Sequence, residues 1–333
     1  MKKLNLPLCP KNPDFLPIGR DKPWLAPLAG YSDLPFRSLC REYGAAVCVT
    51  EMISAQGLVY GSSGTFKLLE STEYDQPLVV QLFGSKKEFL LQAIKLLSEK
   101  AYGWFDFNMG CPVPKVLKQG SGGALLLDLN YAFDLISSMI DIVGFGRMGI
   151  KIRRSYDGNV PSFDELINFL LRLQDIGLGW VSVHPRTTKQ KYTGKADWNV
   201  IADLKKYLSI PIIASGDLLS ASDGINCMNL TSADCVMYAR GALYNPAIFL
   251  DHKMILSGKD SVKRDILDIK NLIIRHMDLT KKFNGDKAFL KLRSILPRYV
   301  RNFSSAKHLR EALCHCTDWK MIYETLEKIF IKD

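Results

Sequence analysis

Short apolar segments, each about the length of a buried strand, recur along the first two thirds of the chain. They lie at residues 24–28, 46–50, 78–82, 104–108, 148–152, 180–184, 211–214 and 235–239. Between them, apolar residues recur at helical spacing, for example over 34–43, 87–97, 132–142, 163–176 and 198–208. This alternation predicts a fold of the α/β class, a parallel sheet closed into a (β/α)8 TIM barrel. An open doubly wound sheet is the alternative, but no GxGxxG sequence follows the first strand.

The pattern changes after residue 248. No further strand-like segment follows, and residues 262–283, 288–301 and 307–331 have the spacing of three amphipathic helices. We therefore predict two domains, a barrel at residues 1–250 and an all-helical domain at residues 251–333.

The positive charge of the chain is concentrated in its last quarter. The formal net charge is +10, and residues 251–333 hold 18 Lys and Arg against 11 Asp and Glu, which is 18 − 11 = +7. A local excess of this size predicts a polyanionic partner, nucleic acid before membrane, with a merely solvated basic face as the alternative. The basic residues that we expect to contact nucleic acid there are Lys281, Lys282, Lys287, Lys291, Arg293, Arg298 and Arg301.

The remaining composition excludes several classes of protein. No segment approaches the roughly 20 apolar residues of a membrane span, and no signal-peptide pattern opens the chain, so we expect a cytoplasmic protein with no membrane partner. The eight cysteines lack paired CxxC spacing. Cys314, His315 and Cys316 have no second ligand pair nearby, so we predict no metal site.

In a barrel, active-site groups lie at the C-terminal ends of the strands. Cys111 follows the strand at 104–108, on a loop that Pro112 and Pro114 keep irregular. At this point its thiol is readable as a nucleophile, a metal ligand or a redox sensor. Polar or charged residues also follow most of the other strands, which is more than coincidence predicts.

The loops after the last two strands are the most specific. Gly216 and Gly241 allow close approach of the backbone to a ligand, and Arg240 adds a charge, so these loops predict a phosphate site. Lys151 and His184 would then lie beside it and hydrogen-bond the edge of a flat ring. Gln81 offers a donor and an acceptor to a pyrimidine-like edge.

Eight motifs occur in one order along most of the chain. They are APLAGYSDLPFR at 26–37, TEMISA at 50–55, QLFG at 81–84, DFNMGCPVPKVLKQGSGGALL at 106–126, KIR at 151–153, VHPRTTKQKYTGKADW at 183–198, SGD at 215–217 and ARGAL at 239–243. Together they resemble the tRNA-dihydrouridine synthase family, in its bacterial form, and NMGCP is the most specific of them. The sequence departs from the family pattern at Ser215 and Pro185, where the family often has Asn and Gly.

The resemblance implies an FMN-binding barrel with a helical tRNA-binding domain, in an enzyme that uses NADPH to reduce uridine in tRNA to dihydrouridine. Carried over to this chain, the residues around the flavin ring would be Pro27, Leu28, Gln81, Lys151 and His184. Those on the phosphate side would be Ser215, Gly216, Asp217, Arg240 and Gly241. Cys111 would be the general acid.

The family's chemistry suggests a role for each group. With hydride delivered from FMN to uracil C6, a proton must reach C5, and an unperturbed thiol with a pKa near 8.5 is protonated at neutral pH and can donate it. Asn108 would hold the uracil edge, and Arg186, Lys189 and Lys191 would contact tRNA phosphates. We expect a monomer. The alternatives are a flavin oxidoreductase acting on a free small molecule, such as a dihydroorotate-dehydrogenase-like enzyme, and an RNA-binding protein that has lost the chemistry.

Overall fold

The computed structural model describes residues 6–10, 12–301 and 306–330. Eight parallel strands form a closed barrel, in which neighbouring strands pair and β2 closes the ring against β4. This confirms the predicted (β/α)8 architecture. The strands are β1 Trp24–Leu25, β2 Val47–Val49, β4 Leu78–Phe83, β5 Phe105–Met109, β6 Met148–Ser155, β7 Trp180–Thr187, β8 Ile212–Ala214 and β9 Cys235–Tyr238, with a two-residue strand β3, Ile53–Ser54, added beside β4.

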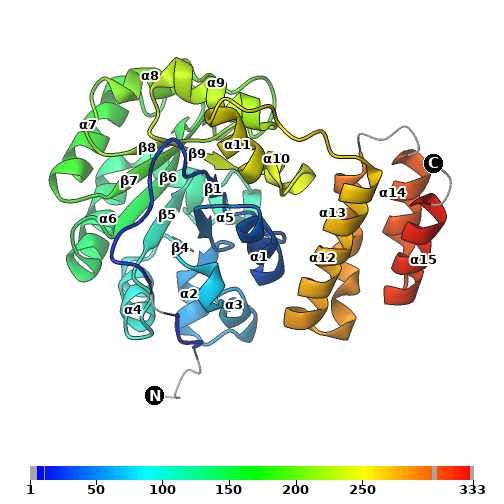
Figure 1. Cartoon of the computed structure of the whole chain (residues 1–333). Coiled ribbons are helices and arrows are strands. Elements are labelled where there is room, and N and C mark those ends of the chain that lie inside the picture. The colour runs from blue at the N-terminus through cyan, green and yellow to red at the C-terminus, as the bar shows by residue number, and fades with distance from the viewer. Residues whose placement is uncertain (1–5, 11, 302–305, 331–333) are drawn as a thin grey trace.

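Helices surround the barrel (Figure 1). Several begin at the caps that their sequences favour: Asp33 caps α1, and Ser162 and Ser220 form capping boxes at α7 and α9. The helices of this part are α1 Leu34–Glu42, α2 Ala55–Val59, α3 Ser63–Lys67, α4 Lys87–Ser98, α5 Pro114–Leu117, α6 Leu129–Val143, α7 Phe163–Asp175, α8 Asn199–Lys205, α9 Ala221–Thr231, α10 Arg240–Tyr244 and α11 Ile248–Leu256, with 3-10 turns at Glu73–Asp75 and Gly122–Leu127.

The strands differ in length from the predicted ones in a way that matters for the site. β1 ends at Leu25, because Pro27 lacks the N–H that would continue the ladder. β6 and β7 instead run on to Ser155 and Thr187. Arg186, predicted to lie on a loop, is therefore a strand residue.

The interior of the barrel is closed at one end by an apolar floor. Its largest side chains are Trp24, Trp104 and Trp180, which lie ring to ring at centroid distances of 5.7 Å for Trp24–Trp180 and 6.4 Å for Trp104–Trp180. Gly149 makes room for them, because a Cβ there would clash with the Trp180 ring. The floor leaves only the mouth of the barrel, at the C-terminal ends of the strands, for a ligand.

The last part of the chain is helical, as predicted, and stands beside the barrel in Figure 1. Its elements are α12 Ile266–Asn284, a 3-10 turn at Asp286–Ala288, α13 Phe289–Tyr299, α14 Ala306–His315 and α15 Trp319–Phe330. α12 begins later than predicted, at a capping box between Asp265 and Asp268. The helix predicted over 307–331 is two helices, because Asp318 accepts a hydrogen bond from the Met321 N–H and begins α15; residue 331 lies outside the described range.

The predicted boundary at residue 250 falls within α11. His252 of this helix is buried, its Nδ1 2.7 Å from the Tyr238 hydroxyl of β9, so α11 packs on the barrel. The division into two domains stays a prediction, and the chain is non-helical from 257 to 265 between α11 and α12. None of the helices in the described part of the chain is both long and apolar enough to cross a membrane.

Candidate active site

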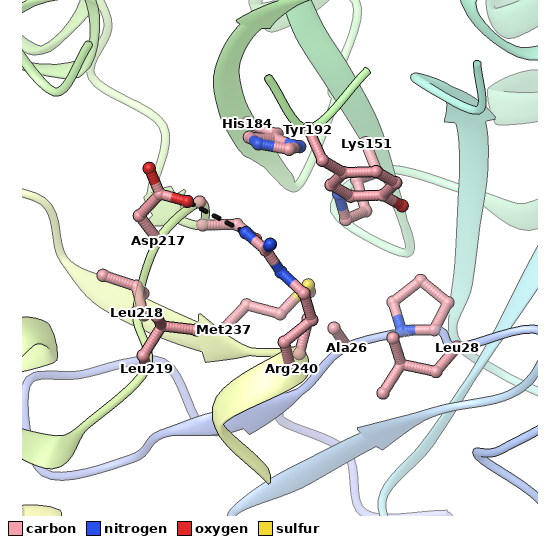
Figure 2. Close-up of a pocket in the computed structure, with 14 residues that line it drawn as sticks. Ala26, Leu28, Lys151, His184, Tyr192, Asp217, Leu218, Leu219, Met237 and Arg240 are labelled. Atoms are coloured by element: carbon pink, nitrogen blue, oxygen red, sulfur yellow. Dashed lines mark hydrogen bonds and ion pairs between the residues drawn. The ribbon is translucent and has the colours of Figure 1, made fainter. Parts of the chain in front are cut away.

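A pocket opens at the mouth of the barrel, among the ends of β6 to β9 and the loop after β1 (Figure 2). Eight of the ten residues predicted to bind the cofactor line it: Pro27, Leu28, Lys151, His184, Ser215, Gly216, Asp217 and Arg240. Figure 2 shows Lys151, His184 and Tyr192 on one side and Leu28 with Ala26 on the other. The structure therefore brings together side chains that are up to 213 positions apart, from Pro27 to Arg240.

The pocket is strongly electropositive. Burial, together with the neighbouring charge of Arg153, lowers the pKa of Lys151 to about 8, while the Asp106 carboxylate opposes both effects. Among the described residues, the Lys151 ammonium has no hydrogen-bond or ion-pair partner. Burial and the surrounding cations Lys151, Arg153, Arg186 and Arg240 lower the pKa of His184 to about 2, so its ring is neutral at pH 7. A group with negative charge or exposed lone pairs would find unsatisfied donors here.

The loops after β8 and β9 have the close packing that their glycines predict. Gly216 has φ +105° and lies against the His184 ring, where a Cβ would come within 2.7 Å of it. Within the described residues, the backbone N–H groups of Gly216 and Leu218 donate to no protein acceptor. Gly241 does not line the pocket; a Cβ there would lie 2.5 Å from the Leu218 carbonyl oxygen, so Gly241 lets the two loops pack together.

Asp217 and Arg186 form an ion pair that was not predicted from the sequence. Arg186 is 2% exposed and donates to both Asp217 carboxylate oxygens, at 2.8 and 2.6 Å, and to the carbonyls of Thr193 and Gly194. Asp217 also accepts from Arg240 at 2.9 Å. The guanidinium of Arg186 is thus buried and hydrogen-bonded within the protein, and its predicted contact with tRNA phosphates stays a prediction. Asp217 thus holds the two arginines in place.

The Cys111 loop is held firmly at the end of β5. The Asn108 carboxamide oxygen accepts from the N–H groups of Gly110 and Cys111, at 3.2 and 3.0 Å. The Cys111 carbonyl accepts from Gly123 at 3.0 Å, and Gly122, with φ +63°, has no room for a Cβ beside Cys111. Burial raises the pKa of the Cys111 thiol above its usual value, although a hydrogen bond from Val113 and nearby positive charges oppose this.

The Asn108 side chain, predicted to hold the uracil edge, is hydrogen-bonded within the protein, and its contact with substrate stays a prediction. Its two amide hydrogens point to the Gln81 Oε1, at 2.8 Å, and the Met52 sulfur, at 3.1 Å. Gln81 in turn donates to Asp106 at 2.7 Å and lies below the pocket rather than in its lining. Both side chains therefore belong to a buried network under the Cys111 loop.

Two residues of the site were missed from the sequence. Tyr192 lies at the pocket with its ring 5.1 Å from the Arg240 guanidinium and 6.3 Å from the His184 ring. Arg153 donates to the carbonyls of Gly110, Thr187 and Lys191, each at 2.8 Å, and so ties the Cys111 loop to the loop after β7. An aromatic residue among the lysines of 189–195 was the only available signal for Tyr192.

Comparison with known proteins gives the family. A sequence model described as dihydrouridine synthase matches residues 24–332. The chain belongs to the dihydrouridine synthase family. A probable tRNA-dihydrouridine synthase of Helicobacter pylori is 32% identical over 315 residues, which cover 93% of each chain. The tRNA-dihydrouridine synthase B of Xanthomonas axonopodis pv. citri is 28% identical, over 86% of each chain.

Solved structures agree on the fold of this family member. An old yellow enzyme homologue from Zymomonas mobilis superposes with a TM-score of 0.50 at 10% identity, over 78% of this chain and 96% of its own. A 2-naphthoyl-CoA reductase superposes with a TM-score of 0.52 at 8% identity, over 74% of this chain and 49% of its own. These likenesses support the barrel and nothing finer.

The basic residues predicted to bind nucleic acid fall into two groups. Lys189, Lys191, Lys281, Lys282, Lys287 and Arg301 are exposed. Lys291, Arg293 and Arg298 are partly buried and bind within the protein, to Asp33, the Cys314 carbonyl and the Tyr31 hydroxyl at 2.9, 2.6 and 2.9 Å.

These contacts place α13 of the family member along the rim of the barrel. Lys291 meets the loops after β1 and β2, through Asp33 at 2.9 Å and Glu51 at 3.7 Å. At the other end of the helix, the Arg301 guanidinium lies 4.2 Å from the Tyr244 ring, which follows β9. A basic helix thus borders the pocket mouth.

Proposed function

We propose that this protein reduces uridine in tRNA to 5,6-dihydrouridine, with FMN as cofactor, NADPH as electron donor and Cys111 as proton donor. Membership of the dihydrouridine synthase family and the names of its relatives support the reaction and the substrate. The observation that carries the proposal is the position of Cys111. Asn108 pairs with Lys151 across β5 and β6, so the Cys111 loop adjoins the electropositive pocket.

The residues present fit a flavin mononucleotide. The Lys151 ammonium, which has no partner within the described ranges, and the neutral His184 would meet the polar edge of the ring, and Pro27 and Leu28 its face. The Gly216 and Leu218 N–H groups, with Arg240, would hold the phosphate. Bound there, FMN supplies the hydride that reduces uracil at C6.

Cys111 then acts as the proton donor. Its raised pKa keeps the thiol protonated at neutral pH, so it is an acid poised to deliver a proton to C5 of the same ring. The Asn108 cap and the Gly123 hydrogen bond fix the loop that carries the thiol. Preorganisation of this kind places a proton donor without rearrangement during the reaction.

The surface supports a folded RNA as substrate. A uracil in tRNA must leave its stack to reach the barrel mouth, which costs a few kcal/mol. The exposed lysines of α12 and of the loop after β7 would supply phosphate contacts that offset this cost. α13 beside the mouth would bring the helical domain into contact with the same RNA.

The two half-reactions test this proposal separately. In Cys111→Ala, we expect FMN binding and the reduction of the flavin by NADPH to be unchanged, while reoxidation by tRNA slows by about 10²-fold or more. Cys314→Ala is the matched control, because Cys314 is an exposed free cysteine on α14, and it should behave as wild type in both steps. Normal reoxidation of Cys111→Ala by tRNA would remove Cys111 from the mechanism, and a colourless wild-type protein would remove the flavin.

A further inference from the structure

Two buried polar side chains, Gln81 and Asp106, lie in one layer of the barrel with Gly149 and Trp180 of the apolar floor. Strand register puts Gln81, Asp106, Gly149 and Trp180 side by side on β4 to β7. Asp106 is 1% exposed and Gln81 is fully buried. Burying a carboxyl group at this depth costs folding free energy unless hydrogen bonds or a nearby opposite charge offset the loss of water.

A series of hydrogen bonds connects Asp106 to the Cys111 loop, and in each of them the donor lies on the side of the loop. Gln81 Nε2 donates to Asp106 Oδ2 at 2.7 Å, and Asn108 Nδ2 donates to Gln81 Oε1 at 2.8 Å. Asn108 Oδ1 is thereby turned toward the N–H groups of Gly110 and Cys111. Asp106 thus sets the orientation of the Gln81 amide, and Gln81 sets that of the Asn108 amide.

We propose that Asp106 is a positioning residue for Cys111, whose carboxylate fixes the orientation of the Gln81 and Asn108 amides and thereby the loop that carries the thiol. The inference rests on the proposed function, in which Cys111 is the proton donor. It assigns a role to a residue that does not itself line the pocket and that acts on Cys111 through Gln81 and Asn108.

The hydrogen bond between Gln81 and Asp106 determines the orientation of both amides. A carboxylate can only accept hydrogen bonds, so it admits one orientation of the Gln81 amide. If that amide turned round, its NH2 would face the Asn108 NH2, and Asn108 would have to turn as well. Asn108 would then present donors to the N–H groups of Gly110 and Cys111, and both caps would be lost. A neutral amide or acid at position 106 can donate or accept, so it no longer excludes the turned arrangement.

The groups that face Asp106 determine the charge of its carboxyl group. Gln81 on β4 and Lys151 on β6 face it, and its Oδ1 has no hydrogen-bond partner among the described residues. The Trp180 Nε1 on β7 also faces the Asp106 carboxylate and favours its charged form, although the two groups do not reach normal hydrogen-bond geometry. Burial raises the pKa of Asp106 to about 7, against the hydrogen bond from Gln81, the charge of Lys151 and the nearby Trp180 N–H. The carboxylate is therefore ionised in most molecules only above neutral pH, and the orientation it fixes should weaken in acid.

Cys111 alkylation tests the proposal without any RNA turnover. The rate of iodoacetamide modification of Cys111 is followed by peptide mass spectrometry in the FMN-loaded protein, with the exposed Cys314 as internal reference. In Asp106→Asn we expect the Cys111 rate to change by roughly fivefold or more, while Cys314 keeps its wild-type rate. Reduction of the flavin by NADPH should also be unchanged, and reoxidation by tRNA should slow.

A double-mutant cycle separates positioning from general damage. Because Asp106 acts through Asn108, Asp106→Asn should add nothing to the effect of Asn108→Ala on the Cys111 rate. Ser182→Ala is the matched control. Its buried hydroxyl has no hydrogen-bond partner among the described residues. Ser182 lies opposite Lys151 in the register of β6 and β7 and takes no part in the hydrogen bonds from Asp106 to Asn108. A wild-type Cys111 rate in Asp106→Asn, or effects of the two variants that multiply, would overturn the proposal.

A second variant covers the case in which Asp106→Asn does not fold. Gln81→Leu breaks the same chain one link later and should change the Cys111 rate in the same direction, again without adding to Asn108→Ala. An unchanged Cys111 rate in that variant would equally refute the proposal. If instead the alkylation results hold but wild-type protein fails to reduce tRNA, the proposed function fails and the positioning of Cys111 stands.

Discussion

Asp217→Asn removes one negative charge from the centre of the pocket wall while keeping the shape of the side chain. In the structure, the carboxylate accepts two hydrogen bonds from Arg186, one from Arg240 and one from the Ala196 N–H, at 2.6 to 2.9 Å. An asparagine would turn an NH2 group toward a guanidinium. Arg186, 2% exposed, would then be a buried cation without a counter-charge.

The expected loss of stability follows from this geometry. Breaking a buried ion pair by removing one partner costs about 3–5 kcal/mol. The Asp217 side chain is 28% exposed, so solvent screens part of the interaction, and we expect a loss of about 2–3 kcal/mol. Arg240 also loses its partner, and FMN affinity should fall by about tenfold, which corresponds to about 1.4 kcal/mol.

Urea unfolding of the apoprotein measures the first effect. The midpoint should fall in Asp217→Asn with the m-value unchanged. Asp203→Asn is the matched control, because its pair with Lys206 is exposed on both sides, and it should stay within about 0.5 kcal/mol of wild type. A loss below about 0.5 kcal/mol in Asp217→Asn would refute the account of the Arg186 pair.

The contribution of Asp217 to folding stability changes with pH in a definite direction. Burial alone would raise the pKa of Asp217, but the hydrogen bonds from Arg186 and Ala196 and the charges of the two arginines lower it overall. A depressed pKa in the folded state stabilises the protein above the unfolded value, near 3.9, and this contribution is lost as the pH falls through the folded pKa. The stability difference between wild type and Asp217→Asn should therefore be constant from pH 5 to 7 and shrink below about pH 4.

Three further predictions concern the floor, the pocket and the surface. Gly149→Ala should cost about 1–3 kcal/mol or more, since its Cβ would clash with Trp180, whereas Gly103→Ala, which has space for a Cβ, should be nearly neutral by the same urea assay. FMN affinity, followed by flavin fluorescence, should fall as the pH rises past about 8, where Lys151 loses its charge, and Lys151→Met should flatten that profile. If Lys281 contacts duplex phosphate, Lys281→Ala should reduce the slope of log Kd for tRNA against log salt by about 0.9, and an unchanged slope would exclude the contact.

The sequence was sufficient for the barrel, because apolar strands and amphipathic helices alternate with clear periods. It also placed the pocket, since strand ends converge in any such barrel and Gly216 lines it as predicted, whereas the packing role of Gly241 between two loops was not predictable. The roles of Arg186 and Asp217 were not predictable, because their pairing joins residues 31 positions apart and depends on β7 continuing to Thr187.

The same limit applies to the network under Cys111. The alternation of Phe105, Asp106, Phe107 and Asn108 shows that Asp106 and Asn108 share a face, but not that Gln81 lies between them. That contact depends on the register of β4 against β5, which the turns and the closure of the barrel decide. Local pattern was likewise insufficient for the break at 316–318, where a single Asp318 cap interrupts an otherwise continuous apolar stripe.

The most direct test of the proposed function is dihydrouridine formation by the purified protein. An unmodified tRNA pool from cells that lack this protein is incubated with the FMN-loaded enzyme and NADPH, and its nucleosides are analysed by mass spectrometry. We expect uridine at a defined tRNA position to gain two hydrogens with wild type, and at most a trace of this product with Cys111→Ala. A flavin-loaded protein that NADPH reduces but that leaves every uridine unchanged would contradict the proposed function.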